Sequence, residues 1–290
     1  MLTRLARKIP AWGLGLVLLS AGLLKGADPA EFVRQVGTYG ILTGKAAATL
    51  AYLLIPLEVV LGAALLAGYR TRWAAAAGSI LMAIFMAATA YAWSQGKVEG
   101  CGCFGSLASR TPGQVLVEDS VFLGLGIAAF FLAPPRAAGP RWRIVPVLTA
   151  LAAAVLLSLT AYALPLDPLV TDLRIGQGIE KLPLRVSPVD LSTGDHLAAL
   201  LDLDSTESRK IVSALNALSG AGVSVIAFYG GEVDEKIIFC FNYSPGFDVV
   251  AVPRPELKRL FRKLPRFFRI REGRVAGIWE GSPPKIEELR

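Results

Sequence analysis

The residues best suited to chemistry are Cys101 and Cys103, in the run Gly100-Cys101-Gly102-Cys103-Phe104-Gly105. Two thiols one residue apart can close a small disulfide ring, and the flanking glycines allow the turn that such a ring requires. A tight ring is easily reduced, which favours thiol–disulfide exchange over permanent stapling. The alternatives are a fixed structural disulfide, a metal site and two unreactive thiols. We expect no metal, because two thiolates do not complete a tetrahedral shell and His196 is the single histidine.

The composition indicates a membrane protein. Of the 290 residues, 53% are hydrophobic and only 18% are charged, and the mean hydropathy is +0.52. An ordinary soluble domain has about 25% charged residues. Three cysteines in a chain of this length also exclude a disulfide-rich secreted framework.

Five stretches are apolar enough, and long or nearly long enough, to cross a bilayer, which takes about 20 residues. No convincing cleavage site follows the first, so we interpret it as an uncleaved helix rather than a signal peptide. Four of the five tryptophans fall at the edges of these stretches, where amphipathic rings meet the interface. The predicted spans are Ile9–Leu24, Ala46–Ala67, Trp73–Trp93, Val115–Leu132 and Ile144–Leu164.

The charges predict the orientation. Residues 1–165 carry 13 Lys and Arg against 6 Asp and Glu, which accounts for the whole net charge of +7, whereas residues 166–290 carry 17 of each. A basic surface for nucleic acid is not expected in the most hydrophobic half, so nucleic acid is excluded as a partner. The positive-inside rule favours a cytoplasmic N-terminus in the inner membrane, with the cysteine loop and the C-terminal domain outside, in the periplasm or extracellular space. The inner segments then carry Arg4, Arg7, Lys8, Arg70, Arg72, Arg136, Arg141 and Arg143 and no acidic residue.

Glu58 is the ionisable residue deepest in a span. A carboxylate at that depth costs roughly 3 kcal/mol on insertion scales, so we expect it to face the bundle and to be protonated or paired. Two interpretations stay open: a proton carrier or quinone ligand, and an interhelical hydrogen bond that serves packing. Lys25 closes the first span, where snorkelling explains it. Glu118 and Asp119 open the fourth span and are expected at the interface.

Three sequence elements resemble a known family. The run Leu23-Leu24-Lys25-Gly26-Ala27-Asp28-Pro29, the pair Leu57-Glu58 and the run Cys101–Gly105 look like the methylamine-utilisation MauE group of the DoxX-like membrane proteins. The resemblance covers roughly residues 9–133. It implies a four-helix membrane bundle associated with redox handling, and in the methylamine system such a protein assists maturation of a disulfide-rich periplasmic enzyme subunit.

We therefore expect an α-helical membrane bundle followed by an α/β domain outside the membrane. Residues 1–133 are the MauE/DoxX-like four-helix domain, residues 134–165 are a basic inner loop and a fifth linking helix, and residues 166–290 are the outer domain. In this last part the pattern predicts strands at Leu197–Leu203 and Val223–Phe228, helices at Ser205–Leu218 and Pro255–Lys263, a mixed region at 232–241, and a closing hairpin with its turn at Glu272-Gly273.

This order of elements resembles the thioredoxin fold. In active thioredoxin-like proteins a Cys-x-x-Cys opens the helix after the first core strand, and here Ser205-Thr206-Glu207-Ser208 occupies that place. Because serine hydroxyls form no disulfide, the resemblance implies a domain without redox chemistry of its own. It also implies that Pro265 is a cis-proline.

Three further features are interpreted as structural. Cys240 lies in an apolar run and is expected to be a buried, inert thiol. His196 has no partner that would make it catalytic. The stretch Arg254–Arg274 carries nine Lys and Arg; a solvated face is the ordinary explanation, and contact with anionic lipid or an acidic partner is the other.

The function that fits these features is thiol–disulfide exchange through Cys101 and Cys103, in support of the maturation or redox poise of an exported protein. The partners would be the bilayer and an exported thiol protein or a thioredoxin-like protein. One alternative is a non-enzymatic assembly or docking protein whose disulfide is permanent. Another is a quinone-coupled oxidoreductase in which Glu58 takes up and releases protons. A quinone cofactor is expected only under this alternative.

Overall fold

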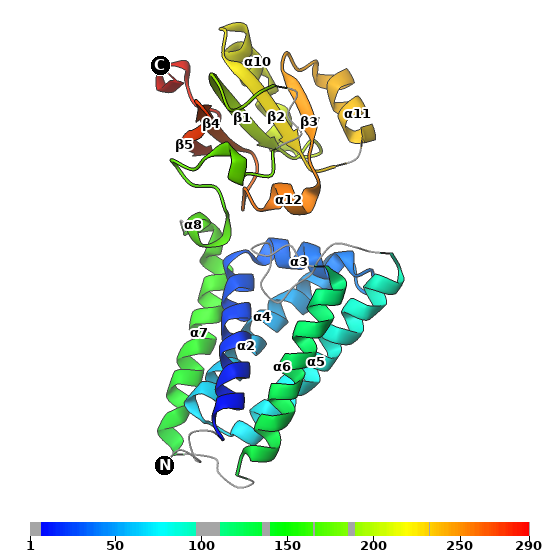
Figure 1. Ribbon diagram of the computed structural model, residues 1–290, viewed down its shortest axis with the longest axis vertical. Coiled ribbons are helices and arrows are strands. Elements are labelled where there is room, and N and C mark those ends of the chain that lie inside the picture. Colours follow the sequence, from blue (N-terminus) through cyan, green and yellow to red (C-terminus); the bar gives the residue numbers. More distant parts are fainter. Residues whose placement is uncertain are drawn as a thin grey trace. The chain divides into compact units, whose positions relative to one another are not determined.

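The computed structural model describes residues 7–96, 111–134, 140–164, 166–184, 189–231 and 233–289. The chain divides into two compact units, Met1–Leu166 and Asp167–Arg290, called here the helical unit and the sheet unit (Figure 1). Cys101 and Cys103, as well as Arg4 and Arg136 of the predicted inner charges, lie outside the described residues.

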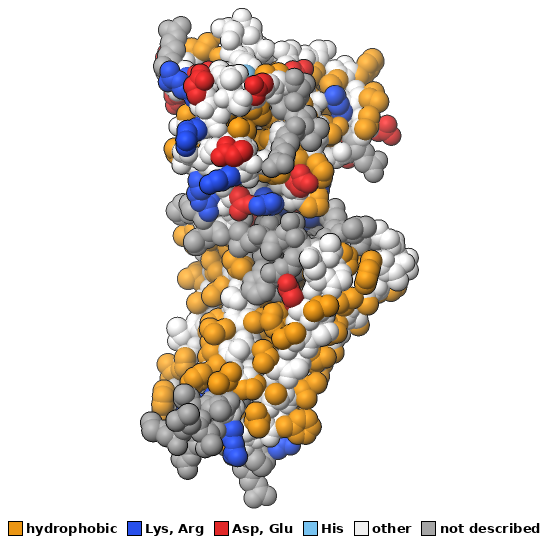
Figure 2. All heavy atoms as spheres, viewed as in Figure 1, with side chains coloured by type: hydrophobic (Ala, Val, Ile, Leu, Met, Phe, Trp, Pro, Cys, Tyr) orange, Lys and Arg blue, Asp and Glu red, His pale blue; other side chains and the backbone are white. Residues whose placement is uncertain are grey.

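The helical unit confirms the five predicted apolar helices. Among the described residues, five helices are long and apolar enough to cross a membrane, and their outward side chains are mostly hydrophobic (Figure 2). Ends differ from the predicted bounds by up to four residues. The helices are α2 (Ile9–Ala27), α3 (Pro29–Thr38), α4 (Gly44–Ala67), α5 (Thr71–Ser94), α6 (Pro112–Leu132) and α7 (Ile144–Thr160), with short 3-10 turns η2 (Arg141–Arg143) and η3 (Ala161–Ala163).

Helix α3 was not predicted. Asp28 caps it by accepting a hydrogen bond from the Glu31 backbone NH at 3.3 Å, and Pro29 begins it, an arrangement suited to a helix N-terminus. The helix lies across the end of the bundle where α2 finishes (Figure 1). It is amphipathic rather than apolar throughout, so a search for membrane spans does not detect it.

Glycines bring α2 and α4 into close contact. A Cβ built on Gly62 of α4 would lie 2.6 Å from the Leu19 backbone nitrogen and 2.7 Å from the Gly15 carbonyl oxygen, both on α2. Backbone atoms cannot move aside as a flexible side chain can. Small residues are what allow membrane helices to approach in this way.

Gly62→Ala is therefore expected to push α2 and α4 apart and to destabilise the helical unit by about 1–3 kcal/mol. The measurement is thermal unfolding of the full chain in detergent. Gly124→Ala on α6 is the matched control, because a Cβ there meets nothing within 4 Å among the described residues. The control should be neutral or slightly stabilising, since alanine favours a helix; equal melting temperatures for both variants would contradict the close contact.

The sheet unit contains one mixed five-stranded sheet in the order β3-β2-β1-β4-β5 (Figure 1). The strands β1, β2 and β3 run parallel, and β4 and β5 form an antiparallel hairpin next to β1. Glu272 and Gly273 turn that hairpin with positive φ values of 47° and 70°, as predicted. The strands are β1 (Asp195–Leu201), β2 (Ser224–Tyr229), β3 (Asp248–Ala251), β4 (Arg266–Arg271) and β5 (Arg274–Glu280).

Both faces of the sheet are covered. Val212, Leu215 and Leu218 of helix α10 pack on one face, together with Phe239 of α11. Residues of helix α12 and of the segment 173–191 pack on the other face. The helices of this unit are α8 (Asp167–Val170), α9 (Thr206–Lys210), α10 (Val212–Gly220), α11 (Val233–Tyr243) and α12 (Arg254–Lys258), with 3-10 turns η4 (Ile179–Lys181) and η5 (Ile286–Leu289).

Several predicted elements of this unit need correction. The single helix predicted from Ser205 is split into α9 and α10 at Ile211, and the apolar spacing continues across the break, so periodicity does not reveal it. The mixed region at 232–241 is helix α11, whose apolar run has no helical period because most of it is exposed. Strand β3 was missed, and α12 ends at Lys258 rather than Lys263.

The basic stretch is only partly a solvated face: Arg254, Arg271 and Arg274 are exposed, whereas three other basic residues are buried. Lys258, Arg262 and Arg266 are all at most 6% exposed. Asp167, at the start of the sheet unit, pairs with Arg266 at 2.8 Å and with Arg262 at 3.2 Å. Burial of these side chains among partners that are distant in sequence explains why the charge pattern alone was misleading.

Candidate functional site

The centre of the helical unit holds an ion pair between Lys25 of α2 and Glu58 of α4. The Lys25 Nζ donates a hydrogen bond to the Glu58 Oε1. Glu58 is completely buried and Lys25 is 6% exposed. The pairing expected for Glu58 is present, and it joins two of the sequence elements that carry the family resemblance.

The expectation that Lys25 snorkels to the interface is wrong. Helix α2 continues to Ala27, so Lys25 lies within it, and its ammonium group lies 4.8 Å from the ring centre of Phe32 and 4.9 Å from that of Phe85. Aromatic faces attract a cation at this range. The sequence offered no direct signal for this, because Phe32 and Phe85 come from α3 and α5.

The ion pair is stabilised by few polar neighbours. The second oxygen of Glu58, Oε2, has no hydrogen-bond partner among the residues that the structure describes. A buried ion pair offsets its desolvation only when its partners stay together. The two side chains are therefore strongly dependent on each other, whatever chemistry they take part in.

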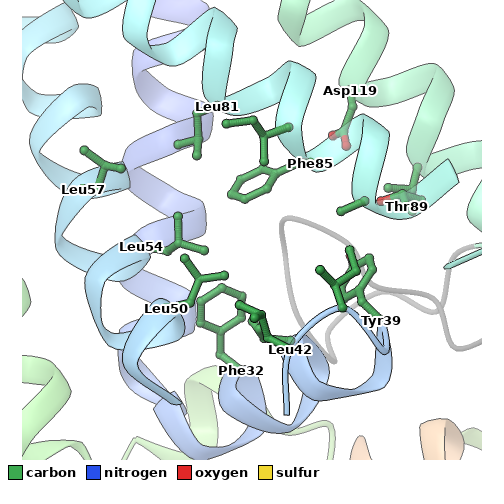
Figure 3. Close-up of a pocket in the computed structure, with 15 residues that line it drawn as sticks. Phe32, Tyr39, Leu42, Leu50, Leu54, Leu57, Leu81, Phe85, Thr89 and Asp119 are labelled. Carbon is green, nitrogen blue, oxygen red and sulfur yellow. The ribbon is translucent and has the colours of Figure 1, made fainter. Parts of the chain in front are cut away.

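A cavity of about 360 Å³ lies beside the pair, between α3, α4, α5 and α6 (Figure 3). Phe32 and Phe85, the rings that contact Lys25, line it. Most of its remaining wall is aliphatic, and the polar groups on it are those of Tyr39, Thr89 and Asp119. Leucines of α4 form one side, and Phe85 and Thr89 of α5 with Asp119 of α6 form another (Figure 3).

Asp119 is the residue whose place was predicted wrongly. It is 2% exposed rather than interfacial, because α6 begins at Pro112 and Asp119 lies about two turns inside it. The available signal was the capping box at the start of α6, in which Thr111 and Gln114 bond each other's backbone NH groups.

Asp28, which follows α2, connects α3 to the turn η3. Its carboxylate caps α3 and also accepts a hydrogen bond from the Tyr162 hydroxyl at 3.2 Å. Tyr162 belongs to η3, which follows α7. Lys25 and Asp28 of one sequence element thus connect the end of α2 to α4, to α3 and to η3.

The predicted redox pair, Cys101 and Cys103, lies outside the described residues. What the structure describes is the two helices that this loop joins. Helix α5 precedes it and α6 follows it, and both contribute residues to the cavity, Thr89 near the end of α5 and Asp119 near the start of α6.

In the sheet unit, serines stand where the thioredoxin resemblance calls for cysteines. The Ser205 hydroxyl accepts from the Ser208 backbone NH at 3.0 Å, which confirms Ser205 as a helix cap. It also donates to the Ser208 hydroxyl at 2.9 Å, and Ser208 is fully buried. The Leu264–Pro265 peptide bond is cis, as the resemblance implied.

Two candidate residues of the sheet unit remain, His196 and Cys240, and the first has structural partners. His196 bonds the Ser224 hydroxyl at 2.9 Å and the Thr193 carbonyl oxygen at 2.7 Å. Cys240 is only partly buried, on α11, so its predicted burial is incomplete. Hydrogen bonds from Arg269 hold the pKa of Asp195 below its usual value, and the same bonds raise the pKa of Arg269.

Comparison with known proteins adds one match. Residues 4–134 match the family model described as methylamine utilisation protein MauE. No curated protein and no solved structure matches the chain. The matched segment contains α2 to α6, with the Lys25–Glu58 pair and the cavity, and ends before α7. Residues 4–134 are thus similar to MauE proteins, and together with the apolar helices this similarity supports an integral membrane protein; α7 and the sheet unit lie outside the matched residues.

Proposed function

We propose that the protein is a membrane thiol–disulfide redox protein that supports the maturation or redox poise of an exported protein. Cys101 and Cys103 are its exchanging pair. The observation that carries the proposal is that their loop joins α5 to α6, two helices that line a cavity containing a buried carboxylate inside a membrane bundle. A disulfide used only for stapling would not require a buried carboxylate on the helices that the segment connects.

The proposed orientation keeps the N-terminus in the cytoplasm and the cysteine loop and sheet unit outside the inner membrane. Arg70 and Arg72 at the start of α5 and Arg141 and Arg143 at the start of α7 support it, because positive residues favour the cytoplasmic side. On the outer side a disulfide can form and persist. The description of the matched family names methylamine utilisation, and we propose this pathway for the protein. We also propose that the helical unit is related to the DoxX-like membrane proteins.

We propose a thioredoxin-like fold for the sheet unit, and a role in holding a client protein. Supporting this are the hairpin β4–β5 beside the parallel strands β1 and β2, the helix that begins after Ser205 and the cis-proline Pro265. With serine at Ser205 and Ser208, the unit exchanges no thiols itself.

Trapping tests the redox function. In cells quenched with acid, Cys103→Ala should accumulate a mixed disulfide between Cys101 and a second protein, because the resolving thiol is missing. The band should appear on non-reducing gels and vanish with reductant. Cys240→Ala is the matched control and should not alter the trapping. A loop disulfide that resists mild reductant, with no trapped partner, would contradict exchange.

A docking role is the second candidate, and one observation favours it. Helix α11 exposes Ile237, Ile238 and Phe241, the last of which is 87% exposed. Apolar side chains grouped on one helix are typical of a surface that binds another protein. The measurement is maturation of the exported protein in cells. If Phe241→Asp abolishes it while replacement of both Cys101 and Cys103 by serine does not, docking is the function.

A further inference from the structure

The cavity of the helical unit has two kinds of wall. Most of it is aliphatic or aromatic, and polar groups are concentrated at Asp119 and Thr89, which are 2% and 6% exposed. We propose that this cavity binds the ring of a lipid-soluble quinone. Transfer of electrons from the loop thiols to that ring rests on the function proposed above, whereas binding of the ring does not.

Size and polarity fit a quinone ring. Small-molecule sites have volumes of about 300–1,000 Å³, mostly apolar walls and a few polar groups that orient the ligand, and this one measures about 360 Å³. Phe32 and Phe85 offer flat faces for a ring, and Asp119 and Thr89 offer hydrogen bonds for its oxygens. A lipid acyl chain matches the aliphatic wall but has no group for the polar end.

The opening of the cavity indicates where the ligand comes from. Leu50, Leu57 and Ile84 line it and are themselves 37%, 43% and 56% exposed on α4 and α5. In a membrane-embedded bundle these side chains face lipid. A ligand with an apolar tail can therefore enter from the bilayer and leave its tail there.

The chemistry balances with a quinone as the oxidant. The two thiols of Cys101 and Cys103 lose two electrons and two protons as their S–S bond forms. The quinone gains two electrons and two protons, and its two carbonyl groups become hydroxyl groups. Protonated Asp119 can donate a hydrogen bond to a carbonyl, and ionised Asp119 can accept one from a hydroxyl.

The test uses the full chain in lipid nanodiscs and a photoreactive azido-quinone with a decyl tail, in competition with unlabelled decyl-quinone. In the wild type we expect the label on cavity residues of α4, α5 or α6, and protection by the competitor. Leu54→Trp, which fills the cavity, should weaken competition at least tenfold. Leu53→Trp is the matched control, because the neighbouring Leu53 is 62% exposed and lies outside the cavity, and it should change competition less than twofold. Asp119→Leu, which removes the hydrogen-bonding group, should weaken competition about tenfold.

Two outcomes separate this inference from the proposed function. Replacement of Cys101 and Cys103 by serine should leave labelling unchanged while abolishing quinol formation by the reduced protein. If the wild type is labelled in the cavity but forms no quinol, the thiol function fails and the quinone site stands. Label confined to lipid-facing side chains outside the cavity lining, or competition equal in Leu54→Trp and Leu53→Trp, overturns the quinone site whether or not a thiol partner is trapped.

Discussion

Lys25→Met is expected to destabilise the helical unit by about 3–5 kcal/mol. The substitution leaves the carboxylate of Glu58 completely buried without its cation, and breaking a buried ion pair from one side costs this much. Methionine keeps the length of the side chain and its contacts with Phe32 and Phe85, so the loss reports charge rather than packing. The measurement is unfolding of the full chain in detergent.

The double variant Lys25→Met/Glu58→Leu should recover most of that stability. Replacement of a buried pair by apolar residues of similar volume is often neutral or stabilising, and a double-mutant cycle isolates the coupling between the two positions. Lys45→Met is the control, since Lys45 is exposed at the start of α4, and it should change stability by less than about 0.5 kcal/mol. Losses that simply add in the double variant would show that Lys25 and Glu58 are not coupled.

Asp167→Ala is expected to have an effect of similar size on the sheet unit, about 3–5 kcal/mol. Asp167 is the carboxylate shared by Arg262 and Arg266, which are 5% and 4% exposed. Its removal leaves two buried guanidinium groups without this partner. Cleavage of residues 167–290 by protease in the full chain, at rising denaturant concentration, measures the loss.

Asp195→Ala is the control for this experiment. Asp195 pairs with Arg269 by a hydrogen bond of 2.8 Å from the Arg269 Nε, but its side chain is 45% exposed. An exposed pair contributes about 0–1 kcal/mol. If Asp167→Ala and Asp195→Ala cost the same, the cluster around Asp167 does not hold the start of the sheet unit in place.

Elements with a strong local signal were predicted well. The apolar helices follow from uninterrupted hydrophobic length, and the hairpin follows from Glu272-Gly273 between two alternating runs. Helix α3 has local signals, the Asp28 cap followed by Pro29, but it is not apolar throughout and so is not detected as a span. Strand β3 has only four residues, too few for a clear alternating pattern. The exposed apolar face of α11 breaks the rule that apolar residues are buried, and periodicity therefore failed there.

The candidate site could be predicted only in parts. Glu58 was singled out because a carboxylate within an apolar span is costly wherever the helix packs. The positions of Lys25 and Asp119 were predicted wrongly, because each residue lies near an end of its predicted span. At such a position, a shift of a few residues in the helix end determines whether a side chain is expected at the lipid interface or inside the bundle. Here α2 ends two residues after Lys25 and α6 begins seven residues before Asp119.

The sequence by itself determined that this is a membrane protein with a Cys-x-Cys loop and a cysteine-poor α/β domain, because hydrophobic length, charge and residue type are local properties. Only the tertiary structure decided that Lys25 pairs with Glu58, that Asp119 lines a cavity between four helices, and that Asp167 pairs with two buried arginines. These contacts join residues between 33 and 99 positions apart. Their existence depends on how helices and strands pack, and no local pattern of residue types encodes that packing.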